Sequence, residues 1–368
     1  MISQTGGNHE TGTLTPKQRV QQCFARRDPG RVPLDYSANP GIDGRLKEHF
    51  GLAPDDNEGL LDALSIDFRH ISPPYTGPKL HADLPDRRID EWGARMQWIE
   101  HETGGYWDYC DFPLRDATVE EVRAWPMPDP DDYDYRQVAH RCVALAEFGL
   151  VAGNPGMGDI INKSGMVGGH EWAFVALADD DPAFALLVDR RLDIQLEVLR
   201  RTLSAGEGLF DVLYIGEDLG TQRGPLIGAD LFRRAVRPRL QRFVDLGIEF
   251  DIPVMIHSCG SSSWAFDDFI EMGISVVDTL QPEAHDMSPA RLKKRFGDRL
   301  AFHGMISTAG PLATGDVEDT VAVVRDTLAT MKPGGGYALA PTHQIQDNTP
   351  TENVVAMYRA AREFGTAD

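Results

Sequence analysis

Residues 253–260 read Pro-Val-Met-Ile-His-Ser-Cys-Gly, an apolar run that ends in a short polar stretch. The apolar run before it, at 211–218, reads Asp-Val-Leu-Tyr-Ile-Gly-Glu-Asp and also ends in polar residues. An amphipathic helical pattern at 229–246 separates the two runs. Short apolar strands that alternate with helices are typical of a parallel sheet. These segments therefore predict a β–α–β unit with its polar residues at the carboxyl ends of the strands.

The same alternation extends along most of the chain in both directions. The predicted strands are 32–36, 65–71, 149–153, 211–216, 253–257, 274–280, 300–304 and 336–340. The predicted helices between or after them include 181–203, 229–246, 288–296, 317–331 and 350–364. Eight such units predict an α/β protein with a single (β/α)8 TIM-type barrel, whose chemistry belongs at the carboxyl ends of the strands.

Two segments fall outside the repeating pattern. Residues 1–14 are polar and are expected to be a flexible leader, whereas 15–368 form the barrel. Residues 72–135 form an insertion after the second strand, rich in tryptophan and proline, with a possible hairpin at 87–99. We expect the insertion either to cover the barrel mouth as a lid or to pack on its side.

Composition excludes several classes of protein. Lys plus Arg number 36 and Asp plus Glu number 57, so the formal charge is 36 − 57 = −21. This charge disfavours binding to nucleic acid or to an anionic membrane surface. An apolar fraction of 42% is too high for a disordered chain, and no apolar run is long enough to span a membrane. Four scattered cysteines without a CxxC pair indicate a reducing, cytoplasmic location.

His257 and Cys259 are the most informative local pair. Residues i and i+2 at a strand end point to the same side, so an imidazole and a thiolate would face one point. Together they supply half of a zinc site. His343, at the end of the last predicted strand, is the expected third ligand. Candidates for a further contact are Glu217, Asp218, Gln281 and Glu283.

Ordered motifs connect the chain with a known superfamily. They include Gly216-Glu-Asp-Leu-Gly-Thr-Gln222, Arg237-Pro238, His257-Ser-Cys-Gly260, Leu280-Gln-Pro-Glu283, Phe302-His-Gly304 and Gly335-Gly-Tyr-Ala-Leu-Ala-Pro-Thr-His343. With these motifs, residues 15–366 resemble the uroporphyrinogen decarboxylase superfamily. That superfamily contains decarboxylases and zinc-dependent methyltransferases that work with corrinoid proteins. The resemblance implies a (β/α)8 barrel and an enzyme.

Two features favour the methyltransferase branch. The arginine-rich motif with which the decarboxylases hold a polycarboxylate is missing from the first strand, which instead carries Asp35. His257 and Cys259 match two zinc ligands of the methyltransferases, although His343 stands where those enzymes are expected to have a second Cys. The departure leaves zinc possible, because imidazole is a good ligand, and puts a thiol substrate in doubt.

The resemblance implies a zinc-dependent methyltransferase or demethylase. It would move a methyl group between an ether, amine or thiol and cobalamin carried by a separate corrinoid protein, with His257, Cys259 and His343 as zinc ligands. Glu217, Asp218 and His257 are the predicted catalytic residues, and the predicted substrate contacts are Asp35, Asn39, Asp67 and Gln281. A homodimer is also expected. The alternatives are a metal-independent decarboxylase and a barrel that only binds a small molecule.

Overall fold

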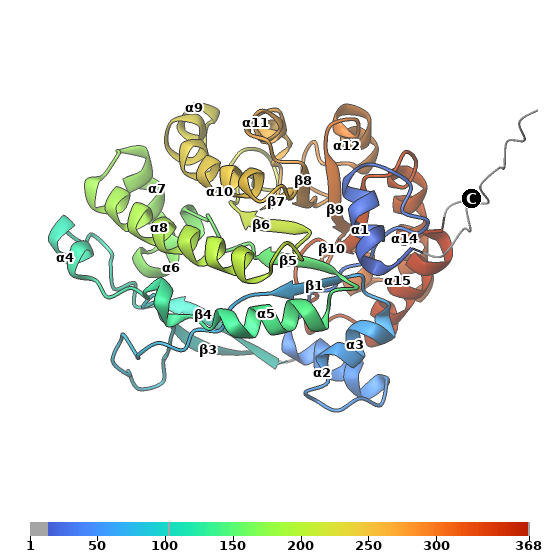
Figure 1. Ribbon diagram of the computed structural model, residues 1–368, viewed down its shortest axis with the longest axis horizontal. Coiled ribbons are helices and arrows are strands. Elements are labelled where there is room, and N and C mark those ends of the chain that lie inside the picture. The colour runs from blue at the N-terminus through green and yellow to red at the C-terminus, as the bar shows by residue number, and fades with distance from the viewer. Residues whose placement is uncertain (1–13, 102–103, 367–368) are drawn as a thin grey trace, which may run out of the picture.

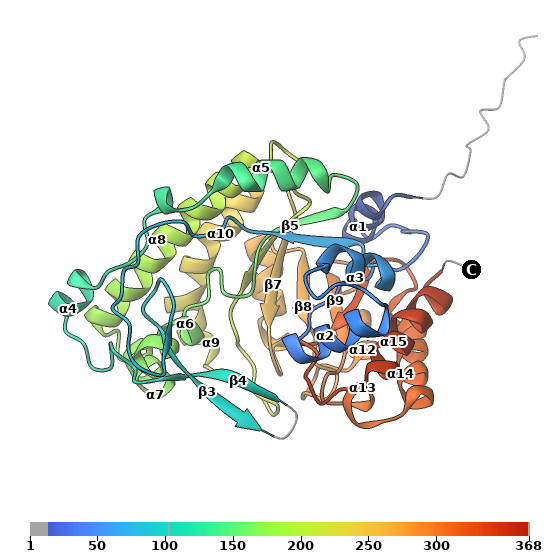
Figure 2. The ribbon, with the colours of Figure 1, turned by 90° about the horizontal axis from the view of Figure 1, so that it is seen from below.

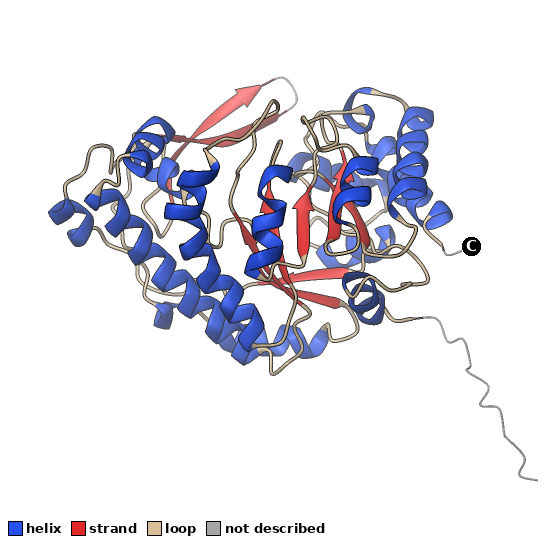
Figure 3. Ribbon diagram, turned by 90° about the horizontal axis from the view of Figure 1, so that it is seen from above, coloured by secondary structure: helices blue, strands red, loops and turns tan. Residues whose placement is uncertain are grey.

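The computed structural model describes residues 14–101 and 104–366, and its centre is one curled parallel sheet. Seven strands lie in the order β1-β5-β6-β7-β8-β9-β10. Their bounds are Phe68–Ile71 (β1), Gly149–Gly153 (β5), Val212–Gly216 (β6), Val254–Ser258 (β7), Val276–Thr279 (β8), Ala301–Ile306 (β9) and Tyr337–Pro341 (β10). Figure 3 shows helices surrounding these strands on the outside. The fold is therefore the predicted TIM-type barrel.

The first predicted strand, 32–36, does not form a regular strand. Leu34 makes a single parallel bridge to Leu339 of β10. The Asp35 amide donates to the Leu339 carbonyl at 3.0 Å, and the Asp67 amide donates to the Leu34 carbonyl at 2.8 Å. The segment thus lies between β10 and the start of β1, but Pro33 has no N–H to donate. The Leu339 amide also donates to the Pro33 carbonyl at 2.9 Å. Backbone pairing of the 32–36 segment is thus short, and an eighth strand of the sheet is not confirmed.

The helices follow the predicted pattern closely. Their bounds are α1 Pro16–Phe24, α2 Pro40–His49, α3 Asn57–Leu64, α4 Val119–Ala124, α5 Tyr135–Ala144, α6 Ile161–Gly168, α7 His170–Ala178, α8 Pro182–Ala205, α9 Ala229–Leu231, α10 Arg237–Glu249, α11 Phe266–Met272, α12 Pro289–Phe296, α13 Pro311–Thr314, α14 Val317–Met331 and α15 Thr351–Phe364. The predicted helix 229–246 is divided, because a π-helical turn (Phe232–Val236) separates α9 from α10. In the described part of the chain, no helix has the length and apolarity to cross a membrane.

Helix α1 closes the amino-terminal end of the barrel. Thr15 begins it with a capping box, and Pro16 occupies its first turn. Val20, Cys23 and Phe24 of α1 pack against side chains from the barrel interior, including Phe68 and Met255. This small apolar cluster fills the bottom of the barrel interior, below the carboxyl ends of the strands where the chemistry of such barrels lies. Figure 1 shows α1 close to β10.

The insertion forms its own antiparallel sheet of β2 (Arg88–Ile89), β3 (Arg95–His101) and β4 (Gly104–Cys110). The predicted hairpin at 87–99 corresponds to the β2–β3 pair. Figure 2 shows β3 and β4 on the side of the molecule that also holds α6 and α7. Apolar residues of the insertion, such as Leu114 and Val122, pack against Val167 of α6 and Leu187 of α8. A lid over the barrel mouth stays a prediction.

Candidate active site

A layer of polar side chains lies directly above the apolar bottom of the barrel. Side chains alternate along a strand, so the residue two positions after an inward-facing apolar residue also faces inward. Inward-facing Met255, Val276 and Ala301 are buried in the bottom cluster. The residues two positions later are His257, Asp278 and His303, and all three line one cavity of about 450 Å³. The strand register thus collects these groups at the carboxyl end of the sheet.

The cavity draws its walls from both halves of the barrel. Its lining residues are Asp35, Tyr36, Ser37, His70, Pro155, Tyr214, His257, Asp278, His303, Ala340, Pro341, Thr342, His343 and Gln344. No lysine or arginine is among these described residues. Histidines are therefore the only side chains in the wall that could carry positive charge.

Asp218, His257 and Cys259 form a compact group at the edge of this cavity. Their potential ligand atoms all lie within 4.8 Å of one another. The Cys259 Sγ is 3.2 Å from the His257 Nε2, and the Asp218 Oδ1 is 3.7 Å from the same nitrogen. Thiolate, imidazole and carboxylate are the three ligand types that zinc takes in proteins. The donor set therefore fits zinc.

Close contact between two loops positions Cys259. The Cys259 amide donates to Asp218 Oδ1 at 2.8 Å, and the Gly260 amide donates to Gln281 Oε1 at 2.6 Å. Gly260 has a φ of +67°, and a Cβ there would lie 2.5 Å from the Gly220 carbonyl oxygen. Only glycine fits such an approach. Gln281, a predicted substrate contact, therefore holds the loop that carries Cys259.

Asp278 sets the orientation of the His257 ring. Its Oδ2 lies 2.8 Å from His257 Nδ1, and the Thr279 hydroxyl oxygen lies 2.7 Å from the same nitrogen. Thr279 has a φ of 83°, in the left-handed region, which is strained for a β-branched residue. With Nδ1 held by the carboxylate, Nε2 faces Cys259. Burial opposes a charge on the ring, but Cys259 and Asp278 outweigh it and raise the His257 pKa, so a metal that binds Nε2 must displace its proton. A carboxylate behind a histidine ligand is the arrangement common to zinc sites.

The hydrogen-bonded chain continues beyond Asp278. Asp278 Oδ1 is 2.6 Å from His303 Nδ1, and His303 Nε2 is 3.1 Å from Asp35 Oδ2. Asp35 Oδ2 also lies 2.9 Å from His70 Nε2. Acidic and imidazole groups therefore alternate from His257 to His70 across the barrel. Asp35, a predicted substrate contact, is buried inside this chain, where its Oδ2 contacts the imidazoles of both His70 and His303.

The His303 imidazole is expected to make the protein less stable as the pH rises into the alkaline range. Burial opposes its charge, but Asp278 and Asp35 outweigh that effect and raise the His303 pKa from 6.5 to about 10. A group whose pKa is higher in the folded than in the unfolded protein stabilises the fold fully at pH values below the unfolded-state pKa. This stabilisation is lost as the pH rises through the folded-state pKa. The melting temperature should therefore fall between pH 6.5 and 10. The fall should be clearly smaller in His303→Gln, and equal slopes for both proteins would contradict the assignment.

Burial also affects the Cys259 thiol. Removal from water raises its pKa, although His257 acts in the opposite direction. A metal must therefore displace the thiol proton when Cys259 becomes a ligand.

His343 and Asn39 are among the predicted site residues that lie outside the compact group. His343 lines the same cavity but is not among the three residues whose ligand atoms converge. Partial desolvation, and then the charge of His257, lower its pKa, so its imidazole is neutral and able to bind a metal. Asn39 precedes α2, and its side-chain amide donates to Gln346 Oε1 at 3.3 Å.

Glu217 faces a helix end and does not line the cavity. Its side chain is fully buried, and its Oε2 accepts a hydrogen bond from the Ile160 amide at 2.8 Å, at the start of α6. Burial, and then the neighbouring Asp159, raise the Glu217 pKa well above its ordinary value. Its contacts are those of a group that fixes the start of α6, whereas its neighbour Asp218 reaches the compact group.

Asp67 lies at the opposite end of the barrel from the cavity. Helix α3 ends at Ser65 in the left-handed conformation, so β1 begins only at Phe68 and Asp67 precedes the strand. Its carboxylate accepts from Arg19 Nε at 3.0 Å, from Arg31 Nη2 at 2.9 Å and from the Leu34 amide at 2.8 Å. These contacts join the 32–36 segment to β1.

Asp67→Ala is expected to destabilise the fold and leave the cavity intact. Removing one partner from a buried ion pair costs about 3–5 kcal/mol, because the other charge is left uncompensated. Chemical denaturation should show a loss of this size, with the metal content of the folded protein unchanged. A variant of normal stability that binds its substrate weakly would instead restore Asp67 as a substrate contact.

No site role was predicted from the sequence for Asp278, His303 or His70. The signal was present, because Asp278 stands two residues after Val276, just as His257 stands two residues after Met255. His303 and His70 stand at strand ends as well, but their shared carboxylate neighbours depend on how the sheet curls.

Comparisons with known proteins give a family match and a fold match for the chain. The family model described as uroporphyrinogen decarboxylase (URO-D) matches residues 162–364. No curated protein matches the chain. A solved methyltransferase from Methanosarcina mazei aligns with a TM-score of 0.66 at 17% identity, over 95% of this chain and 99% of that chain. This likeness shows a shared fold.

Two epimerases align less well. An L-ribulose 3-epimerase has a TM-score of 0.40 at 16% identity, over 64% of this chain and 81% of its own. A D-psicose 3-epimerase has a TM-score of 0.36 at 12% identity, over 67% of this chain and 84% of its own.

Proposed function

Because this chain belongs to the uroporphyrinogen decarboxylase family, we propose that it is a zinc-dependent methyltransferase of that family. It moves a methyl group between a small ether, amine or thiol and the cobalamin of a separate corrinoid protein. The convergence of Asp218, His257 and Cys259 beside the cavity is the observation that carries the proposal. The shared fold with the Methanosarcina mazei methyltransferase supports it. A cytoplasmic location and a homodimer stay predictions.

Methyl transfer from an ether, amine or thioether requires a group that stabilises the negative charge developing on the heteroatom as the methyl group leaves. In transfer toward cobalamin, the bond between the methyl carbon and the heteroatom would break with its electron pair left on the heteroatom, and cob(I)alamin of the partner protein would supply the pair for the new bond to the methyl carbon. Bound zinc would act as the Lewis acid that stabilises this charge, or would activate an incoming thiol. His257, Cys259 and Asp218 would hold the ion, and His343 is the candidate for a further ligand.

Neighbouring side chains keep these ligands in place. Asp278 holds His257 Nδ1 and thereby directs Nε2 toward Cys259. Asp218 is held by the side chain of Asn162, whose Nδ2 donates to Oδ2 at 2.9 Å. Preorganised ligands of this kind raise metal affinity because no rearrangement is needed on binding.

The cavity wall argues against a polycarboxylate substrate. Carboxylates bind well where Arg or Lys side chains supply fixed positive charge. No such side chain lines the described cavity, and its aspartates face inward. A small neutral or cationic methyl compound suits this wall better than a porphyrinogen.

Free methylcobalamin can substitute for the corrinoid protein in a direct test. Zinc-loaded protein should demethylate methylcobalamin in the presence of a suitable thiol, or methylate cob(I)alamin from a methoxy or methylamine donor, with a change in visible absorbance. A panel of such donors and acceptors should be tried with wild type and Cys259→Ala. Decarboxylation of a porphyrinogen by metal-free protein, retained in Cys259→Ala, would contradict the proposal and support the decarboxylase.

A further inference from the structure

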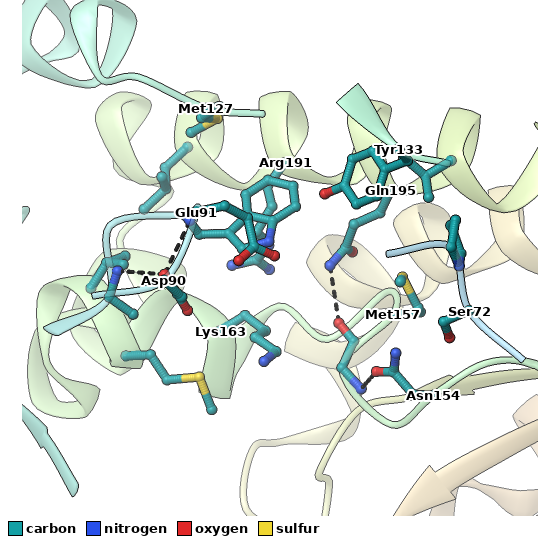
Figure 4. A pocket seen from close by; sticks show the side chains of 18 residues that line it. Ser72, Asp90, Glu91, Met127, Tyr133, Asn154, Met157, Lys163, Arg191 and Gln195 are labelled. Atoms are coloured by element: carbon teal, nitrogen blue, oxygen red, sulfur yellow. Dashed lines mark hydrogen bonds between the residues drawn. The ribbon is translucent and has the colours of Figure 1, made fainter. Parts of the chain in front are cut away.

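A second cavity of about 270 Å³ lies between the insertion and helices α6 and α8 (Figure 4). None of its described lining residues lines the cavity that contains His257. Ser72, Asp90, Glu91 and Trp92 contribute from the insertion, and Lys163 and Arg191 are among the residues contributed by the two helices. The cavity therefore exists only where the insertion meets the barrel.

Arg191 of α8 is the unusual residue in this cavity. Its side chain is buried, with 4% of the residue exposed. Nη2 donates to the Asp159 carbonyl oxygen, but neither Nε nor Nη1 has a hydrogen-bond partner among the described residues. A buried charged donor without a partner is costly, and such groups in native proteins call for a ligand or water.

Lys163 adds a second positive charge to the same wall. It comes from α6, and Figure 4 shows the nitrogen ends of Lys163, Arg191 and Gln195 directed toward the middle of the cavity. Burial lowers the Arg191 pKa to about 10, so the guanidinium is still charged at neutral pH. The cavity wall therefore holds two cationic side chains, and two guanidinium nitrogens of Arg191 have no hydrogen-bond partner among the described residues.

Acidic groups favour the charges of these donors, since Asp159 and Glu217 act on Arg191 and Asp159 also acts on Lys163. Among the described residues, however, none accepts a hydrogen bond from Nε or Nη1 of Arg191. The Asp90 carboxylate accepts from the Trp92 and Ala94 amides at 3.0 and 2.8 Å, within its own turn. Glu91 lines the cavity, but it does not accept from the unpaired Nε or Nη1 of Arg191. A ligand carboxylate at Arg191 would gain charge-assisted hydrogen bonds that Glu91 does not supply.

The rest of the wall is apolar. It includes Met127, Met157, Val167, Leu187 and Val198, together with the ring of Trp92. Pockets for drug-sized ligands hold about 300–1,000 Å³, so this cavity suits a smaller molecule, of about one ring. A ligand that fills it needs an apolar body and an anionic end.

We propose that this cavity binds a small organic carboxylate with an apolar body, whose carboxylate group contacts Arg191 and Lys163. The methionines, the aliphatic side chains and Trp92 enclose the body of the ligand. Binding would tie the insertion to α6 and α8, because both contribute to the wall. The proposal does not depend on zinc or on methyl transfer.

Isothermal titration calorimetry with benzoate tests this site. Wild type should bind benzoate at least tenfold more tightly than benzyl alcohol, which has the same ring without the charge. Arg191→Met and Lys163→Met should each weaken benzoate binding about tenfold or more and leave the binding of benzyl alcohol nearly unchanged. Lys163 is partly exposed, so Lys163→Met decides the question if Arg191→Met does not fold.

Two controls separate this site from the proposed metal centre. Cys259→Ala should bind benzoate as wild type does, and Glu91→Gln should bind it more tightly because a nearby negative charge is removed. The proposal is overturned if benzoate does not bind, if benzyl alcohol binds equally well, or if Lys163→Met has no effect. Loss of benzoate binding in Cys259→Ala would also overturn it, since the anion would then occupy the other cavity.

Discussion

Cys259→Ala is expected to remove bound zinc and methyl transfer together. The substitution takes away the only thiolate in the group with Asp218 and His257, and the two remaining ligand atoms would bind zinc much more weakly. Lewis-acid stabilisation contributes several kcal/mol to a transition state, and each 1.36 kcal/mol is a factor of ten in rate. We therefore expect a loss of at least about a hundredfold in rate. Elemental analysis of the purified proteins, beside the methylcobalamin assay, measures both effects.

Cys110→Ala is the matched control for this change. Cys110 is a free thiol as well, but it is buried in β4 of the insertion and lies outside the compact group. It should keep its zinc and its activity. Full zinc content in Cys259→Ala, or equal loss of zinc in both variants, would show that Cys259 is not a specific ligand.

Asp278→Asn is expected to weaken zinc binding about 10- to 100-fold without removing any ligand. The carboxylate lies 2.8 Å from His257 Nδ1 and 2.6 Å from His303 Nδ1, so it fixes two imidazoles at once. An asparagine of the same shape has no charge and presents its amide in either orientation. The His257 ring would then lose the partner that keeps Nε2 directed toward Cys259. Competition with a zinc chelator measures the change in affinity.

Asp268→Asn controls for a general effect of losing a buried aspartate. Asp268 is buried on α11, where it pairs with Arg233 and Arg237. This variant should lose stability but keep the zinc affinity of wild type. If Asp278→Asn binds zinc as tightly as Asp268→Asn does, Asp278 does not support the ligand.

Much of the barrel could be predicted because its strands are short apolar runs with clear limits. The pair His257 and Cys259 could also be predicted, since the alternation of side chains along one strand is a local property. Which residues of other strands lie next to this pair depends on how the sheet curls, and this is not a local property of the sequence. For this reason the sequence suggested His343 as the third ligand, whereas Asp218 completes the compact group in the structure.

Other differences have local causes. The strand predicted at 65–71 begins three residues later because α3 continues to Leu64 and ends in a left-handed turn, which moves Asp67 to the amino end of β1. Glu217 and Asp218 are neighbours in sequence, yet one side chain turns to α6 and the other to Cys259. The cavity around Arg191 needs the insertion to pack on α8, which no local pattern predicts.

Anomalous scattering from crystals of the purified protein, recorded above and below the zinc absorption edge, tests the central claim most directly. We predict a zinc peak between the Cys259 Sγ, the His257 Nε2 and the Asp218 carboxylate, with distances of about 2.3 Å to sulfur and about 2.0–2.2 Å to nitrogen and oxygen. Crystals of protein purified without chelators that show no peak there, or a peak bound by other residues, would contradict the claim.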